Sequence, residues 1–306
     1  MATIYSQQND ISFGLLRLLF HDCFIKLGTW LFNYSGCDAS VFLDDSNGNK
    51  NHSVKRQATP NKTLRGINEI DMIKEELENA CLGVVSCADT LALATRDAVV
   101  LAGGPYYPIF TSKRDSTQSY FDEAMDKISK PNNNITQTLF LFSRRGFDER
   151  ETVNLLGAHN LGKSSCDFIR DRLTNFSRTG QPDASVDPNF LNELRLACQD
   201  SNNTNHDGIV ASMTSREMGN SSSAVICQGL STSIPSGALY ASDDGTTFRR
   251  DFSRSMSNLG VLTGTLGQVR NKCSFPILQS LMTMLFHVTN DKDFVCLPET
   301  TYEFEK

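Results

Sequence analysis

The stretch that decides the fold lies near the amino terminus, where residues 17–24 read RLLFHDCF. Apolar side chains recur at helical spacing through residues 11–24, which predicts a buried α-helix. Arg17 and His21 lie four residues apart, so both project from one face of that helix. An Arg–His pair at this spacing is in general a solvent-exposed pair, but this helix is otherwise almost wholly apolar. A buried arginine requires an anionic partner or a ligand, so the sequence favours a functional site here.

A second histidine lies in the stretch LLGAHNLGK, residues 155–163. His159 sits at the end of an apolar helix among small residues, and such a histidine is more often a satisfied core residue than a ligand. Gly157 and Ala158 would, however, let a flat macrocycle approach the helix closely. The two histidine clusters together are more informative than either one alone.

Helical periodicity dominates the rest of the chain, and strand-like alternation is scarce. The predicted class is therefore all-α. Ser86 and Asp148 are the expected N-caps of two of the helices. The expected helices after the first span residues 66–80, 86–102, 149–159, 163–173, 188–198 and 244–259, and residues 199–237 are expected to be loop.

Composition narrows the class of function. A chain of 306 residues with 39% apolar content can bury a core large enough to enclose a cofactor. The net charge of -6 argues against nucleic-acid binding, which needs a basic face. The longest apolar stretch, residues 275–288, falls short of the roughly 20 residues that span a membrane. Small-molecule chemistry is the function class that remains.

Cysteine usage indicates an oxidising compartment. The chain has nine cysteines and no CxxC pair, which argues against a zinc ribbon or a thioredoxin-like centre. Seven Asn-x-Ser/Thr sequons give weak support in the same direction. The first residues, MATIYSQQND, lack the basic and apolar regions of a secretory signal, which conflicts with that inference.

Several motifs then occur in a recognisable order: RLLFHDCF, GCDAS, VSCADTLALATRDAV, LAGGP, KRDS, LLGAHNLGKSSC and LTGTLGQVRNKC. Between Phe13 and Cys273 the chain resembles the class III plant secretory peroxidases, the horseradish peroxidase family. The resemblance implies an all-α haem peroxidase fold that holds haem b and oxidises small phenolic donors with hydrogen peroxide. It also implies a monomer, secreted to the cell wall or vacuole, that acts in hydrogen peroxide catabolism and the response to oxidative stress.

The same resemblance divides the chain. Residues 1–140 would form a distal lobe, with an inserted loop at 27–35. Residues 141–273 would form a proximal lobe, whose segment 244–273 returns to the distal side. Residues 274–306 are an atypical tail without counterpart in the family.

Site roles follow from the resemblance residue by residue. His159 would coordinate the haem iron, and on the opposite face His21 would move the proton of the peroxide. Arg17 would stabilise the charge that develops as the O–O bond breaks, and Phe20 would pack over the haem. Asn61 would accept the ring N–H of His21, in which case its sequon should not be glycosylated.

Calcium is the second implied ligand. The distal site would use oxygens of Asp22, Ile25, Gly36, Asp38 and Ser40, although without the resemblance Asp38 and Ser40 would be read as an ordinary turn. Asn160 would begin the proximal site. Either Val54 or Lys55 stands where a glutamate normally supports the distal site, and Ser129 replaces a proline that lines the donor site.

Three disulfides are implied by position in the family, namely Cys23–Cys37, Cys87–Cys273 and Cys166–Cys198. Cys81 matches a fourth, whose partner is expected before the first residue of this chain. Cys81, Cys227 and Cys296 are therefore left over.

One departure opens an alternative. After Ala238 the family has a further block, which carries the acidic ligands of the proximal calcium and the aspartate that hydrogen-bonds the proximal histidine. Without that aspartate, His159 would bind iron but would be a poorer electron donor. The alternative to an active enzyme is a catalytically weak or inactive haem-binding remnant, or the product of a mispredicted gene.

Overall fold

The computed structural model describes residues 1–25, 36–44, 54–130, 133–158, 164–184, 186, 188–199, 209–210, 245–261 and 267–277. The elements in chain order are α1 (Ala2–Gln7), α2 (Ile11–Cys23), η1 (Ser40–Phe42), η2 (Lys55–Gln57), η3 (Thr59–Asn61), α3 (Ile67–Ala80), α4 (Cys87–Leu101), α5 (Phe121–Lys127), α6 (Ile135–Ser143), α7 (Glu149–Gly157), β1 (Ser164–Ser165), α8 (Cys166–Thr174), η5 (Phe176–Arg178), α9 (Pro188–Gln199), β2 (Ile209–Val210) and α12 (Thr246–Val261). Within this part of the chain the strands are confined to the two-residue antiparallel pair β1–β2, so the all-α class is confirmed. None of the described helices is long and apolar enough to cross a bilayer.

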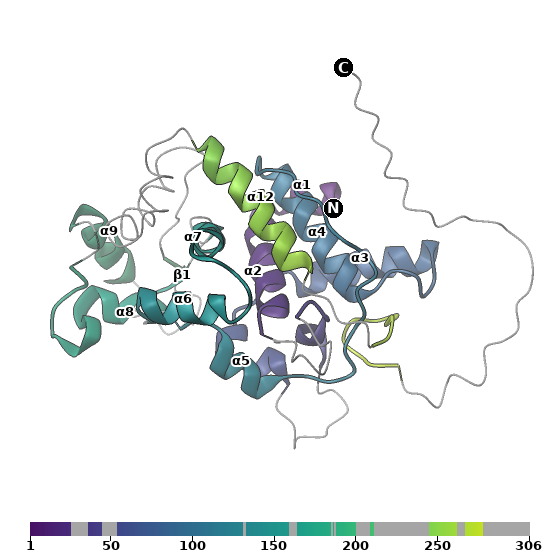
Figure 1. Ribbon diagram of the computed structural model, residues 1–306, viewed down its shortest axis with the longest axis horizontal. Coiled ribbons are helices and arrows are strands. Elements are labelled where there is room, and N and C mark those ends of the chain that lie inside the picture. Colours follow the sequence, from purple (N-terminus) through teal and green to yellow (C-terminus); the bar gives the residue numbers. More distant parts are fainter. Residues whose placement is uncertain are drawn as a thin grey trace, which may run out of the picture.

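The core is built where α2 packs on α4 (Figure 1). Leu15 and Leu18 of α2 and Leu91 and Ala98 of α4 are fully buried. Thr95 of α4 also donates from Oγ1 to the carbonyl oxygen of Leu15, at 3.3 Å. Because α2 is held by this packing, the polar side chains on its other face start from a backbone of fixed position and direction.

The predicted caps are confirmed. The Ser86 hydroxyl accepts from the backbone N–H of Asp89 at 3.0 Å and begins α4. Asp148 accepts from the N–H of Glu151 at 2.7 Å, and the Glu151 carboxylate accepts from the N–H of Asp148 at 3.0 Å. Such a reciprocal pair satisfies two backbone donors that a helix start leaves open.

Three sequence-based expectations differ from the structure. The helices α1, α5 and α6 were not among those predicted, although Asn134 and Gln137 form a capping box at the start of α6. The helix expected over 163–173 begins only at Cys166, because residues 164–165 pair as a strand with residues 209–210. That pair also places a short strand inside the segment 199–237, which was expected to be loop.

Helix α12 packs against α7 and α2 (Figure 1). The contact with α7 is close at Gly157, where an added Cβ atom would lie 2.5 Å from Cε2 of Phe248. The Phe248 ring of α12 therefore occupies the space that a side chain at position 157 would fill. This corrects the interpretation of Gly157 as space for a macrocycle.

Helices α8 and α9 form a separate cluster at one end of the molecule (Figure 1). Its buried residues are Leu173, Leu191 and Leu194, and the disulfide Cys166–Cys198 joins the two helices.

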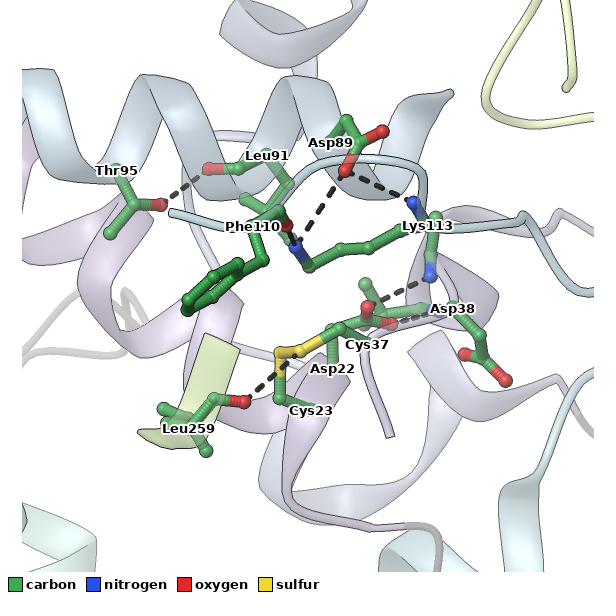
Figure 2. The surroundings of a disulfide bond; sticks show 12 residues. Asp22, Cys23, Cys37, Asp38, Asp89, Leu91, Thr95, Phe110, Lys113 and Leu259 are labelled. Carbon is green, nitrogen blue, oxygen red and sulfur yellow. Dashed lines mark hydrogen bonds and ion pairs between the residues drawn. A yellow bond between two sulfur atoms is a disulfide. The ribbon is translucent and has the colours of Figure 1, made fainter. Parts of the chain in front are cut away.

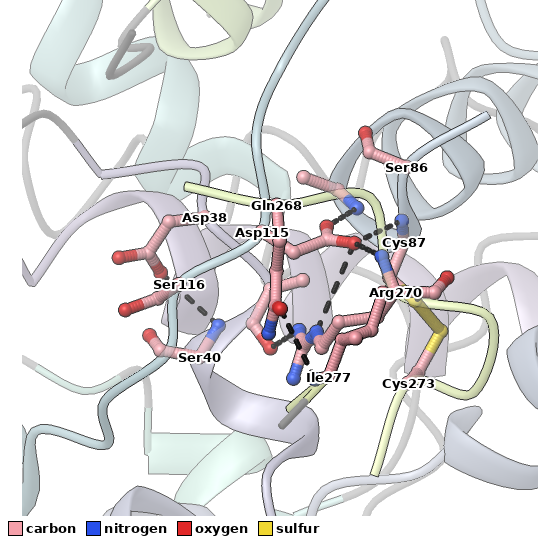
Figure 3. Close-up of polar contacts among 12 residues, drawn as sticks. Asp38, Ser40, Ser86, Cys87, Asp115, Ser116, Gln268, Arg270, Cys273 and Ile277 are labelled. Atoms are coloured by element: carbon pink, nitrogen blue, oxygen red, sulfur yellow. Dashed lines mark hydrogen bonds and ion pairs between the residues drawn. A yellow bond between two sulfur atoms is a disulfide. The ribbon is translucent and has the colours of Figure 1, made fainter. Parts of the chain in front are cut away.

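A buried carboxylate joins the start of α4 to the segment 267–277 (Figure 3). Asp115 is fully buried and accepts from the backbone N–H groups of Cys87 at 3.1 Å, Ala88 at 2.9 Å and Arg270 at 2.9 Å. Burial raises the pKa of Asp115, and the nearby Arg270 guanidinium opposes that rise. The disulfide Cys87–Cys273 ties the same two segments covalently.

Candidate active site

Helix α2 carries the candidate catalytic residues on the face predicted from their spacing. His21 is buried, with 5% of its surface exposed, whereas Arg17 and Phe20 are half-buried. The packing of α2 on α4 holds the helix, so these three side chains share one rigid support.

His21 is anchored by Asn61. The Nδ1 atom of His21 lies 2.6 Å from Oδ1 of Asn61, and both residues are buried. The Asn61 amide is oriented in turn, because its Nδ2 donates to the backbone carbonyl of Lys55 at 2.7 Å. The atom that faces His21 is therefore an acceptor, so Nδ1 of His21 carries the proton and donates it. In the neutral ring this leaves a basic lone pair on Nε2.

Arg17 is held by the same short segment that holds His21. One terminal nitrogen donates to the carbonyl and the hydroxyl of Thr63, both at 3.0 Å, and the other donates to the carbonyl of Pro60 at 2.8 Å. Burial lowers the pKa of the Arg17 guanidinium from its usual value. No carboxylate among the described residues pairs with Arg17, so its charge is available to an anionic group that is not part of this fold.

Phe20 belongs to a cluster of aromatic rings. It stacks on Phe24 with ring centroids 4.5 Å apart and on Phe142 at 5.9 Å, and it meets the His21 ring edge-on at 6.0 Å. The cluster fixes one wall beside His21. The role of Phe20 over a haem stays a prediction.

The expected distal calcium ligands Asp22, Asp38 and Ser40 are brought together. Asp22 is buried, and its carboxylate accepts from the N–H groups of Ala39 at 2.8 Å and Val41 at 3.3 Å. Asp38 accepts from the N–H of Ser40 at 3.1 Å. Figures 2 and 3 show Asp38 from two sides, next to Asp22 in the first and next to Ser40 in the second.

The backbone around these three residues is tightly packed. Cys37 is bonded to Cys23 (Figure 2), and an added Cβ atom on Gly36 would lie 1.5 Å from the carbonyl oxygen of Cys23. Position 36 therefore requires glycine. Ile25, whose carbonyl was an expected ligand, is fully buried, and residues 26–35 between Ile25 and Gly36 lie outside the described residues.

A lysine reaches into this group of oxygens. Nζ of Lys55 donates to the carbonyl of Asp22 at 3.1 Å, to Oδ1 of Asp22 at 3.4 Å and to Oγ of Ser40 at 3.0 Å. Of the two candidates for the position of the usual glutamate, Lys55 is the one that contacts Asp22 and Ser40. Val54 is a buried apolar residue that precedes η2.

The sequence did not assign site roles to Pro60, Thr63 or the Lys55 carbonyl. Pro60 and Thr63 contact Arg17 through oxygens that most residues could provide, because two of the three acceptors are backbone carbonyls. No residue-type signal could have identified them.

Several predicted residues remain to be placed. His159 and Asn160 lie outside the described residues. Ser129 is half-buried after α5, and its hydroxyl accepts from the Asn133 side chain at 3.4 Å.

The three implied disulfides, Cys23–Cys37, Cys87–Cys273 and Cys166–Cys198, are all present. Cys81 is disulfide-bonded as well, which differs from the expectation that its partner lies outside this chain.

Known proteins resemble this chain over most of its length. The family model described as peroxidase matches residues 1–252. Peroxidase 48 of Arabidopsis thaliana is 38% identical to it, over 89% of this chain and 76% of the relative. Peroxidase 39 of the same plant is 35% identical, over 87% of this chain and 83% of the relative.

Proposed function

Because this chain belongs to the peroxidase family, whose members use hydrogen peroxide as oxidant, we propose that Arg17, Phe20 and His21 line the peroxide side of a haem b site and that the donors are small phenols. The observation that carries the proposal is the buried His21 ring, fixed at Nδ1 by Asn61 at 2.6 Å on the helix face that also carries Arg17. Residues 1–140 and 141–273 are proposed as the distal and proximal lobes on either side of the haem.

Arg17, Phe20 and His21 are residues suited to one face of a haem. His159 would hold the iron, Phe20 would contact the ring, and the guanidinium of Arg17 would face the peroxide or a carboxylate of the haem. A half-buried arginine without a carboxylate partner in the described part of the chain supports this assignment. A bound haem supplies the iron at which peroxide is reduced and passes on the electrons taken from donors.

His21 would move the proton. With Nδ1–H donating to Asn61, the lone pair of Nε2 accepts a proton from one oxygen of hydrogen peroxide. The same nitrogen returns that proton to the other oxygen, which leaves as water when the O–O bond breaks. Arg17 stabilises the negative charge that grows on the oxygens during this step.

Calcium does not fit the distal oxygens as they are arranged, because Nζ of Lys55 already contacts three of them. The proximal set that would begin at Asn160 lies outside the described residues.

Export to the cell wall or vacuole is part of the proposal. The three implied disulfides and the bonded Cys81 support an oxidising compartment. Two sequon residues, Asn134 and Asn175, are exposed and would accept a glycan, whereas Asn61 is buried and bonded at both amide atoms.

Purified protein reconstituted with haem tests the enzyme against the inactive remnant. We expect a Soret band and guaiacol turnover, and we expect His21→Ala to lower kcat/KM for hydrogen peroxide by about 10²–10⁴ while the haem is retained. Arg17→Ala should lower the same constant, because it removes the charge that stabilises the peroxide oxygens. Arg65→Ala is its matched control, because Arg65 pairs with Asp10 at the surface. Haem uptake without turnover in the wild type would favour the remnant, and failure to take up haem would contradict both.

A further inference from the structure

We propose that the ammonium group of Lys55 permanently takes the place of a distal calcium ion, so that the oxygens of Asp22, Asp38 and Ser40 bind no metal in this chain. The proposal concerns a cation site built from the protein's own side chains. It does not depend on the donor or on the activity proposed above.

The Lys55 ammonium has as many oxygen partners as it has N–H donors. A lysine ammonium carries three N–H donors, and Nζ of Lys55 has three oxygen partners, at 3.0 Å, 3.1 Å and 3.4 Å. The partners are the carbonyl and carboxylate of Asp22 and the hydroxyl of Ser40. These are oxygens of the kinds that calcium binds, supplied by two of the five residues expected to hold it.

Because the site is buried, it can hold either the Lys55 ammonium or a calcium ion, but not both. The side chains of Lys55 and Asp22 are each only 1% exposed, so each charge requires the other for compensation. Calcium would need the same oxygens at 2.3–2.6 Å from the ion. The ammonium group already fills the space between these oxygens, and its positive charge would repel a calcium ion there. The site therefore holds the ammonium or a metal ion, and the lysine is covalently present in every molecule.

Lys55 also supports the distal histidine. Its backbone carbonyl accepts from Nδ2 of Asn61 at 2.7 Å, and Asn61 in turn accepts from His21 at 2.6 Å. Its backbone N–H donates to Oγ of Ser119 at 2.6 Å. The residue that fills the cation site is thus also the residue that positions the Asn61 amide. Treating the protein with a calcium chelator should therefore leave the orientation of His21 unchanged.

The test counts calcium ions per full-length chain after equilibrium dialysis against calcium, with metal content measured by mass spectrometry. Lys55→Glu should bind one calcium ion more than the wild type, because it replaces the ammonium with a carboxylate beside Asp22. Lys74→Met is the matched control: Lys74 is equally buried, in α3, and its loss should leave the calcium count unchanged. Equal counts in the wild type and Lys55→Glu would overturn the proposal.

A second pair of variants keeps the proposal testable if Lys55→Glu does not fold. Ser40→Ala removes one of the expected metal ligands from the wild type, and Asp22→Asn removes the negative charge of another. Both should leave the wild-type calcium count unchanged, and a loss of one ion in either would show that the wild-type site does hold calcium. Because metal content is measured without turnover, neither result depends on whether the chain is an active peroxidase.

Discussion

At the scale of single residues, the direction of His21 is set by an amide 40 positions further along the chain. Asn61 does this because its other amide atom is fixed by the Lys55 carbonyl, which leaves Oδ1 as the atom that meets the imidazole. The proton on Nδ1 is therefore a consequence of a backbone contact, and the basic character of Nε2 follows from it.

We expect Asn61→Ala to lower kcat/KM for hydrogen peroxide by about 10–100-fold without loss of the haem spectrum, because the ring loses the acceptor that orients it. Steady-state kinetics with hydrogen peroxide varied at fixed donor concentration measure the effect. Asn61→Asp keeps an acceptor facing Nδ1 and should restore much of the lost rate. The control is Asn258→Ala, which removes an exposed amide on α12 that contacts Glu151. Equal losses in Asn61→Ala and Asn258→Ala would contradict the positioning role.

The sequence predicted the shared face of Arg17 and His21 because helical spacing alone determines it. It identified Asn61 only through the family resemblance, and it marked position 54 or 55 as a departure without indicating what the lysine does. The contact of Lys55 with Asp22 spans 33 positions, and no local pattern encodes a contact of that kind.

At the scale of elements, the caps of α4 and α7 could be predicted because Ser86 and Asp148 act on residues three positions away. The need for glycine at position 157 could not be predicted, because the Phe248 ring that packs against it comes from α12, far along the chain. A small residue before a histidine suggests space for a cofactor and space for a helix equally well, and only the tertiary contact decides between them.

Gly157→Ala should destabilise the protein by about 1–3 kcal/mol, because the new methyl group would overlap the Phe248 ring. Gly260→Ala is the matched change in α12: its Cβ would lie 3.5 Å from Cδ1 of Ile109, an ordinary contact, and it should stabilise by up to about 1 kcal/mol. Urea unfolding monitored by circular dichroism gives both values. Adding Phe248→Leu to Gly157→Ala should recover part of the loss, and no recovery would show that the cost arises elsewhere.

At the scale of the whole molecule, the N-terminal half and the segment 267–277 are joined at Asp115. The KRDS and LTGTLGQVRNKC motifs contain the two partners, Asp115 and Arg270, but neither motif indicates that they pair. The reason is the fully buried Asp115 carboxylate, which accepts backbone N–H groups from both segments.

Asp115→Asn should cost about 3–5 kcal/mol in the free energy of unfolding, because it leaves Arg270 without its buried counter-charge and replaces one acceptor oxygen with a donor. Asp97→Asn is the control, since Asp97 is half-exposed and pairs with Arg96 at the surface, where a change below about 1 kcal/mol is expected. Guanidinium unfolding with the disulfides intact measures both. A loss no greater for Asp115→Asn than for the control would contradict the role assigned to this carboxylate.

The Lys55 ammonium has one property that no bound ion shares, which is its attachment to the chain. A dissociable ion leaves when the protein is diluted into a medium poor in that ion, whereas a tethered group keeps a high effective concentration at its site in every medium. Folding around His21 would then need no metal supply, and the finished protein would keep that region ordered wherever it is delivered.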